Sequence, residues 1–102
     1  MDYKKIYSEY KNILKLMREK DLSIIKLEIL DNIQNFDTFL NLTTDNKIML
    51  IDLIYDYYVS DDWFEYNLYN FIDETMQNLD EIVKHNFDID YYYNLMDRKL
   101  IG

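Results

Sequence analysis

The chain has 102 residues, carries a formal net charge of −9 at pH 7 and contains no cysteine, and 49% of its residues are hydrophobic. This length and composition fit one folded domain over residues 1–102 and exclude the low-hydrophobicity class of disordered chains. The charge argues against bare nucleic acid and anionic membranes as ligands, and the lack of cysteine excludes disulfides and thiolate zinc sites.

The N-terminal segment has the pattern of an amphipathic helix over about residues 2–19. Its apolar side chains recur at spacings of three and four residues, which places them on one helix face. This stripe comprises Tyr3, Ile6, Tyr7, Tyr10, Ile13, Leu14 and Met17. The opposite side carries Lys4, Lys11, Lys15 and Arg18.

The next segment predicts a second helix over about residues 22–41. Its apolar residues hold helical spacing and are Leu22, Ile25, Ile29, Ile33, Phe36 and Leu40. The stretch 23–30 also fits a strand, because the apolar residues Ile25, Leu27 and Ile29 alternate with polar residues there. The length of the periodic pattern favours the helix, since strands are usually much shorter.

Two more helices are predicted after a polar turn. Thr43, Thr44 and Asp45 supply the turn and an N-cap for a helix over about residues 45–59. Ser60 is the predicted N-cap of a fourth helix, which the apolar spacing carries to about residue 85.

A short last helix completes the predicted fold. Asn86 is suited to end the fourth helix in a left-handed conformation, and Asp88 or Asp90 caps the last one. Four or five helices joined by short polar turns predict an all-α fold, namely a small antiparallel bundle. The residues expected in its core include Ile13, Ile29, Ile51, Phe71 and Leu79.

The sequence offers little for catalysis. His85 is the one histidine and lacks the Glu-x-x-His spacing of di-iron bundles, so it is expected to be an ordinary histidine near a helix end. The single glycine, Gly102, excludes a Gly-rich phosphate loop. Neither Asp61-Asp62 nor Asp88-x-Asp90 has the ligand spacing of a calcium loop. We therefore expect no enzymatic activity, no cofactor and no metal site.

Charge is distributed unevenly along the chain. Residues 1–20 contain six cationic and three acidic residues, a net charge of +3, so the remainder carries −12. Between Asp52 and Asp97 the one cationic residue is Lys84. The basic first helix could compensate the acidic faces of its own molecule, or it could meet the acidic face of a second copy. A basic membrane-surface helix is a third interpretation, which the overall charge disfavours.

Acidic residues mixed with aromatic ones form the candidate partner-binding surface. Helical spacing puts them on outward faces of the third and fourth helices, where a row of carboxylates can imitate the phosphates of a nucleic acid. Tyr and Trp often anchor protein interfaces. The candidate residues are Asp45, Asp52, Asp56, Asp61, Asp62, Trp63, Glu65, Tyr66, Tyr69 and Asp73. The other interpretation is a solubilising face with tyrosines at the edge of the core.

No family is recognised over the whole chain. The segment 52–58, followed by Asp61 and Asp62, resembles the acid-and-tyrosine segment of colicin DNase immunity proteins. Those are small acidic four-helix proteins that block a basic nuclease, although the proline and glycines of their segment are absent here. Phage anti-CRISPR proteins and other DNA-mimic inhibitors are similar in size, acidity and composition.

These features predict a small acidic protein that inhibits or neutralises a basic, nucleic-acid-handling partner, such as a toxin nuclease or a CRISPR effector, by steric and electrostatic occlusion. The alternative is a helical adaptor or regulatory subunit, with a homodimer as one form, whose acidity serves solubility. The longest apolar run, 48–51, is too short to span a membrane, and we expect a cytoplasmic protein. Abundant Ile, Asn, Lys and Tyr without Ala point to a low-GC bacterium or its phage.

Overall fold

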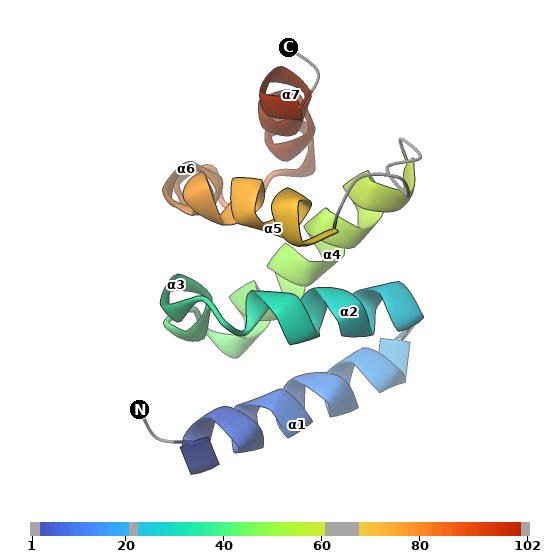
Figure 1. Cartoon of the computed structure of the whole chain (residues 1–102), viewed down its shortest axis with the longest axis vertical. Coiled ribbons are helices and arrows are strands. Elements are labelled where there is room, and N and C mark those ends of the chain that lie inside the picture. The colour runs from blue at the N-terminus through green and yellow to red at the C-terminus, as the bar shows by residue number, and fades with distance from the viewer. Residues whose placement is uncertain (1–2, 21–22, 61–67, 101–102) are drawn as a thin grey trace.

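The computed structural model describes residues 3–20, 23–60 and 68–100, including all side chains in these ranges except those of 19, 20 and 100. The regular structure within these ranges is all helical (Figure 1). The helices are α1 (Tyr3–Lys20), α2 (Ile24–Ile33), α3 (Asp37–Leu40), α4 (Thr44–Ser60), α5 (Leu68–Gln77), α6 (Leu79–Lys84) and α7 (Ile89–Leu100). The predicted all-α class is confirmed, and the stretch 23–30 is helical. The antiparallel bundle of four or five helices is not confirmed.

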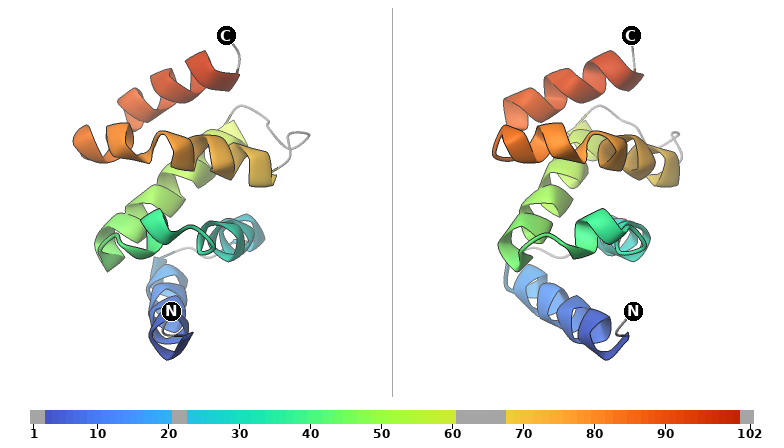
Figure 2. Two further views of the ribbon diagram at one scale, coloured as in Figure 1. Left: turned by 60° about the vertical axis from the view of Figure 1, so that its left-hand side comes forward. Right: turned by 90° about the vertical axis from the view of Figure 1, so that its left-hand side faces the viewer.

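The helices are stacked along the longest axis of the molecule, which measures 41 Å (Figures 1 and 2). α1 lies at one end, α2 and α3 follow, α5 and α6 come next, and α7 lies at the other end. α4 crosses this stack obliquely and contacts α1, α2 and α7. The basic N-terminal helix and the acidic C-terminal helices are therefore far apart in space.

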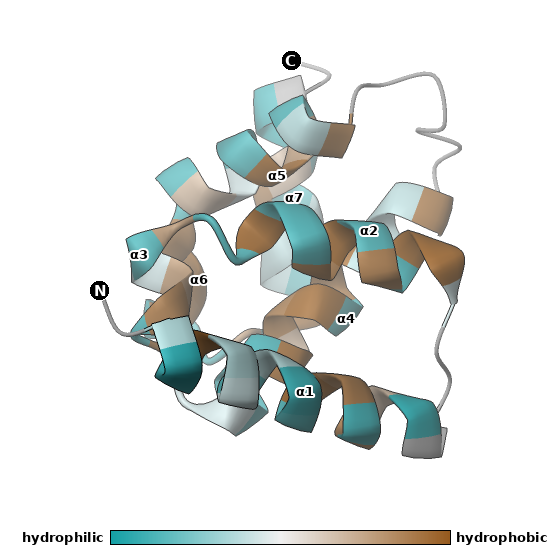
Figure 3. Cartoon of the chain, turned by 60° about the horizontal axis from the view of Figure 1, so that its bottom comes forward, coloured by the Kyte–Doolittle hydropathy of each residue, from teal (hydrophilic) through white to brown (hydrophobic). Residues whose placement is uncertain are grey.

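α4 provides the centre of the core because apolar residues surround most of its circumference. Leu50, Ile51, Ile54 and Tyr57 are fully buried, and Figure 3 shows hydrophobic residues in the middle of α4. The Phe71 ring of α5 packs 5.7 Å from the Tyr57 ring, measured between centroids. The five residues predicted in the core are all buried, namely Ile13, Ile29, Ile51, Phe71 and Leu79.

Short polar side chains cap three of the helices. The backbone N–H of Lys26 donates to Ser23 Oγ at 3.1 Å, so Ser23 caps α2. Thr43 Oγ1 accepts from Asn46 N at 3.2 Å and caps α4, within the turn that the sequence predicted. Asp88 Oδ1 accepts from Tyr91 N at 2.9 Å, so Asp88 rather than Asp90 caps α7. Each bond satisfies a backbone donor that the helix itself leaves without a partner.

The single helix predicted over 22–41 is wrong, because the chain turns between α2 and α3. Phe36 is extended there (φ −95°, ψ 123°), and its N–H bonds the carbonyl of Ile33 at 3.1 Å in a tight turn. The turn brings Phe39 into the core, where it is 1% exposed. Periodicity could not reveal this break, since the apolar spacing continues across it.

The fourth predicted helix is also interrupted. Asn78 leaves helical geometry between α5 and α6, and its side-chain amide donates to the Glu74 carbonyl at 2.8 Å. The side-chain amide of Asn can bond backbone groups in place of the regular helical hydrogen bonds. The periodicity of apolar residues does not reveal such a break. The predicted start of this helix, 61–67, lies outside the described residues, and Ser60 is the last residue of α4, where its hydroxyl donates to Tyr57 O at 3.0 Å.

The turn after α6 has two consecutive left-handed residues. Asn86 has φ 57°, as its sequence position predicted, and Phe87 has φ 56°. A left-handed conformation costs about 1–2 kcal/mol for a residue with a Cβ atom. Burial of the Phe87 side chain, which is 7% exposed, offsets that cost. In the described ranges no helix is both long and apolar enough to cross a membrane.

Candidate functional site

The predicted acidic surface begins on the outward side of α4. Asp45, Met49 and Asp56 follow one another along this side, and all three are exposed. Their neighbours around the helix are buried in the core, so α4 holds these side chains on a fixed backbone. We call Asp45, Met49 and Asp56 the α4 stripe. It presents two carboxylates and one apolar side chain.

Asp52 lies at the edge of this stripe and is committed to another contact. Its Oδ1 is 3.3 Å from Lys26 Nζ on α2, and its side chain is 43% exposed whereas that of Lys26 is 12% exposed. Lys26 Nζ also lies 4.8 Å from the centroid of the Tyr55 ring. Asp52 was predicted to face outward with the other acids. Its side chain is partly exposed, and it also joins α4 to α2, where Lys26 pairs with its charge.

α5 contributes two further candidate residues. Tyr69 is 51% exposed, and its ring centroid is 6.5 Å from that of Phe36. Asp73 is half-buried and accepts a hydrogen bond from Gln77 Nε2 at 2.9 Å, one helical turn away. Five other candidates lie outside the described residues, namely Asp61, Asp62, Trp63, Glu65 and Tyr66.

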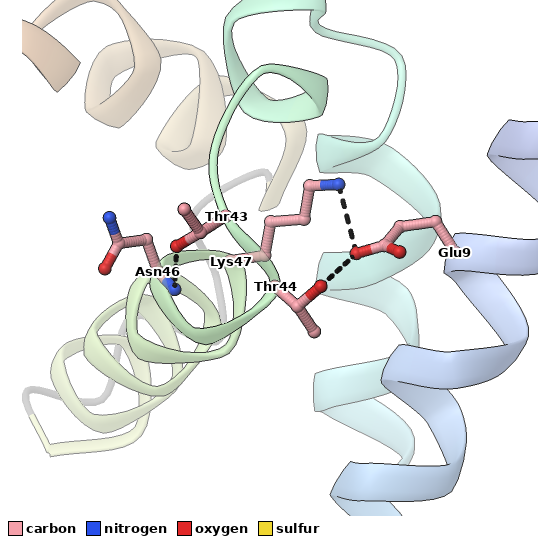
Figure 4. A network of polar contacts seen from close by, with 5 residues as sticks. All are labelled: Glu9, Thr43, Thr44, Asn46 and Lys47. Carbon is pink, nitrogen blue, oxygen red and sulfur yellow. Dashed lines mark hydrogen bonds and ion pairs between the residues drawn. The ribbon is translucent and has the colours of Figure 1, made fainter.

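A partly buried ion pair that the sequence did not reveal fastens α1 to α4. Glu9 Oε1 accepts from Thr44 Oγ1 at 2.6 Å and lies 3.4 Å from Lys47 Nζ (Figure 4). Lys47 is only 4% exposed, and its ammonium group lies 5.7 Å from the Phe39 ring centroid. Because these residues are more than thirty positions apart in sequence, no local pattern could have predicted the pair.

The surroundings of Glu9 favour its ionised form. The hydrogen bond from Thr44 and the positive charges of Lys47 and Lys5 hold the pKa of the Glu9 carboxyl below its usual value, against the opposing effect of partial burial. A carboxylate at this position neutralises a lysine that would otherwise be buried without a counter-charge. The cluster therefore has a structural role in positioning α1.

The outer half of α1 differs from the prediction. Tyr3 and Tyr7 belong to the apolar stripe that was expected to face the core, yet they are 77% and 61% exposed. In the described part of the chain the stripe is deeply covered only farther along the helix, at Ile13 and Met17. One side of the N-terminal turns of α1 lies against α4, where Glu9 contacts Thr44 and Lys47, and another side leaves Tyr3 and Tyr7 exposed.

The exposed part of α1 combines aromatic and cationic side chains. An open hollow of about 370 Å³ is lined by Tyr3, Ile6, Tyr7, Tyr10 and Gln34. Lys11 Nζ lies 5.0 Å from the centroid of the Tyr7 ring. Farther along the same helix, a second hollow of about 410 Å³ is lined by Lys11, Leu14, Lys15 and Arg18. This surface was not among the predicted site residues.

The α6–α7 region presents a second acidic surface. Asp80, Glu81, Asp88 and Asp90 are exposed there, together with Val83 and Ile89. His85 follows the last residue of α6, and its ring stacks on that of Tyr91 with 3.7 Å between centroids. Within the described residues no three His, Cys, Asp or Glu side chains are placed to hold one metal ion.

Comparisons with protein-family models, with curated proteins and with solved structures find no match to this chain.

Proposed function

We propose that the chain is an acidic binding protein that inhibits or neutralises a basic, nucleic-acid-handling protein by steric and electrostatic occlusion. This is the mode of action of DNA-mimic anti-CRISPR proteins and of toxin immunity proteins. The single observation that carries the proposal is the α4 stripe, in which Asp45 and Asp56 are exposed on a helix that supplies much of the core. Carboxylates on so firmly packed a helix need little ordering when a partner binds.

The spacing of the acids supports mimicry of a nucleic-acid strand. Asp45 and Asp56 are eleven residues apart, which is about 16 Å along an α-helix and about the axial rise of five nucleotides in one strand. The exposed Met49 between them adds an apolar contact. Opposite charge on the partner would steer the encounter and speed association.

Affinity capture with the wild type and with charge variants tests the proposal. The bait is exposed to a lysate of a low-GC bacterial host, and mass spectrometry identifies the captured partner. The D45K/D56K variant should lose a partner that binds nucleic acid, and duplex DNA should compete with the wild-type protein for it. The D80K/D90K variant is the matched control, because it makes the same change in net charge on the α6–α7 region. Equal capture by both variants and the wild type would refute occlusion by the α4 stripe.

One observation favours the alternative of an adaptor or regulatory subunit. Tyr3 and Tyr7 are exposed aromatic residues beside a cationic row, and such residues commonly anchor protein interfaces. If K11E/K15E abolishes capture of the partner while D45K/D56K leaves it intact, α1 is the interface and the acids on α4 only keep the protein soluble.

A further inference from the structure

The two ends of the molecule carry complementary surfaces. We define the α1 face as the exposed Tyr3, Tyr7, Lys11, Lys15 and Arg18 at one end of the stack. It offers an aromatic hollow of about 370 Å³ next to a row of positive charges. A ligand that fits this face must carry apolar groups next to negative charges.

The last two helices, α6 and α7, which lie farther along the stack from α1, have that composition. We define the α6–α7 end as Asp80, Glu81, Val83, Asp88, Ile89 and Asp90, all of them exposed. Val83 is 38% and Ile89 43% exposed, so this end presents two aliphatic side chains and four carboxylates, with Lys84 as an exposed cation on α6. The α6–α7 end therefore matches the α1 face both in charge and in its apolar content.

These two surfaces cannot compensate each other within one molecule. α1 and α7 lie at opposite ends of the 41 Å axis, and α2 and α5 stand between them (Figures 1 and 2). Two ion pairs between described residues join Lys26 to Asp52 and Lys47 to Glu9, and neither involves the α1 face. The sequence left open whether the basic helix is neutralised internally, and the geometry argues against it.

We propose that the α1 face binds the α6–α7 end of a second copy of this chain. Because every copy of the chain carries both surfaces, the α1 face and the α6–α7 end are always present at equal concentration. If two copies lie antiparallel, both contacts form at once and the assembly closes as a two-fold dimer. If only one contact forms per pair, the interface is heterologous and the copies join head to tail. This inference concerns surfaces other than the α4 stripe and does not depend on the proposed function.

Two molecules of charge −9 repel each other, and the ionic strength determines whether the local attraction between the α1 face and the α6–α7 end exceeds this repulsion. At about 0.1 M salt the screening length is about 10 Å, so charges elsewhere on a 41 Å molecule contribute little while adjacent charges still attract. At about 1 M salt the screening length is about 3 Å, and the attraction between neighbouring charges is largely lost. Self-association should therefore be present at the lower concentration and weaken at the higher one.

Sedimentation velocity of the full chain over a range of protein concentrations measures the association. The wild type should sediment as a concentration-dependent dimer or larger species at about 0.1 M salt. K11E/K15E and D80K/D90K should each raise the dissociation constant about ten-fold or more, because each converts two attractive surface charges into repulsive ones. D45K/D56K should leave self-association in place. Circular dichroism checks that all three variants stay folded.

A mixture of the two weakened variants gives the sharpest test. K11E/K15E retains a native α6–α7 end and D80K/D90K retains a native α1 face, so mixing them should restore a hetero-complex that neither variant forms alone. A wild type that stays monomeric at every concentration would overturn the proposal. The same conclusion follows if self-association survives both variants, or if mixing them restores nothing.

Discussion

α1 and α4 are helices of nearly equal length, with 18 and 17 residues, but the fold uses them differently. α4 buries residues around most of its circumference, including the charged Lys47. Among the described side chains of α1, only Ile13 and Met17 are buried to that degree. The difference arises from position, because α4 crosses the whole stack whereas α1 lies at its end with one side open (Figure 1).

This contrast separates the part of the molecule that holds the fold together from a part that is available for binding. Burying apolar surface stabilises a fold by about 25 cal/mol per Å², so α4 contributes far more to stability than α1 does. α1 keeps aromatic and cationic side chains at the surface, where they can contact another molecule. Three predictions test how complete this division is, beginning with the largest effect.

The first prediction concerns the centre of α4. Ile51 is 0% exposed, so Ile51→Ala removes fully buried methyl groups and leaves a cavity. We expect it to lower the free energy of unfolding by about 2–5 kcal/mol, measured by denaturant titration. Ile24→Ala is the control, since Ile24 is 76% exposed and the same truncation there should change stability by about 0.5 kcal/mol or less. Equal losses at the two positions would contradict the assignment of α4 as the core helix.

The second prediction concerns the polar link between α1 and α4. Glu9→Gln should lower the free energy of unfolding by about 1–3 kcal/mol, because Lys47 stays buried without a counter-charge while Glu9 itself is partly exposed. The double variant Glu9→Gln, Lys47→Met should recover part of that loss, since it removes the unpaired buried charge. Failure of the double variant to recover any stability would mean that the ion pair is not the cause.

The pH dependence of unfolding provides an independent readout of the same pair. The pKa of Glu9 is lower in the folded protein than its usual value of 4.5. The ionised carboxylate therefore stabilises the fold above pH 4.5, and this contribution is lost as the pH falls through the lower folded-state pKa. Below pH 4.5 the wild type should lose stability more steeply than Glu9→Gln does. Parallel pH profiles would rule out Glu9 as the titrating group.

Sequence patterns predicted those parts of the fold that depend on neighbours along the chain. Apolar spacing located the helices and the core residue Ile51. Turn chemistry placed one cap among Thr43, Thr44 and Asp45 and another at Asp88 or Asp90, and the structure selects Thr43 and Asp88. Sequence patterns did not predict the helix breaks at Phe36 and Asn78. Apolar spacing continues across the first break, and an asparagine side chain causes the second. Helical periodicity indicates which residues share a face of a helix. It does not indicate how far along the helix another helix covers that face.

The candidate site shows the same division. Spacing correctly grouped Asp45 and Asp56 on an exposed side of α4. It did not anticipate that Asp52 pairs with Lys26, or that Glu9 pairs with Lys47, since each pair joins residues on different helices. The exposed tyrosines of α1 were assigned to the core for a related reason. Their spacing is that of a buried stripe, and spacing alone does not reveal that Tyr3 and Tyr7 are 77% and 61% exposed.

The third prediction concerns Tyr7, which is 61% exposed. Replacing Tyr7 with Ala should change the free energy of unfolding by about 0.5 kcal/mol or less, measured by denaturant titration, because little of its surface is buried on folding. The same change should weaken self-association, since a partner would cover the ring and the Lys11 ammonium group beside it. Ile51→Ala should behave in the opposite way and lower stability while the protein that remains folded still associates. If Tyr7→Ala instead destabilises the fold by as much as Ile51→Ala, the outer turns of α1 belong to the core, and the division between a structural α4 and an available α1 fails.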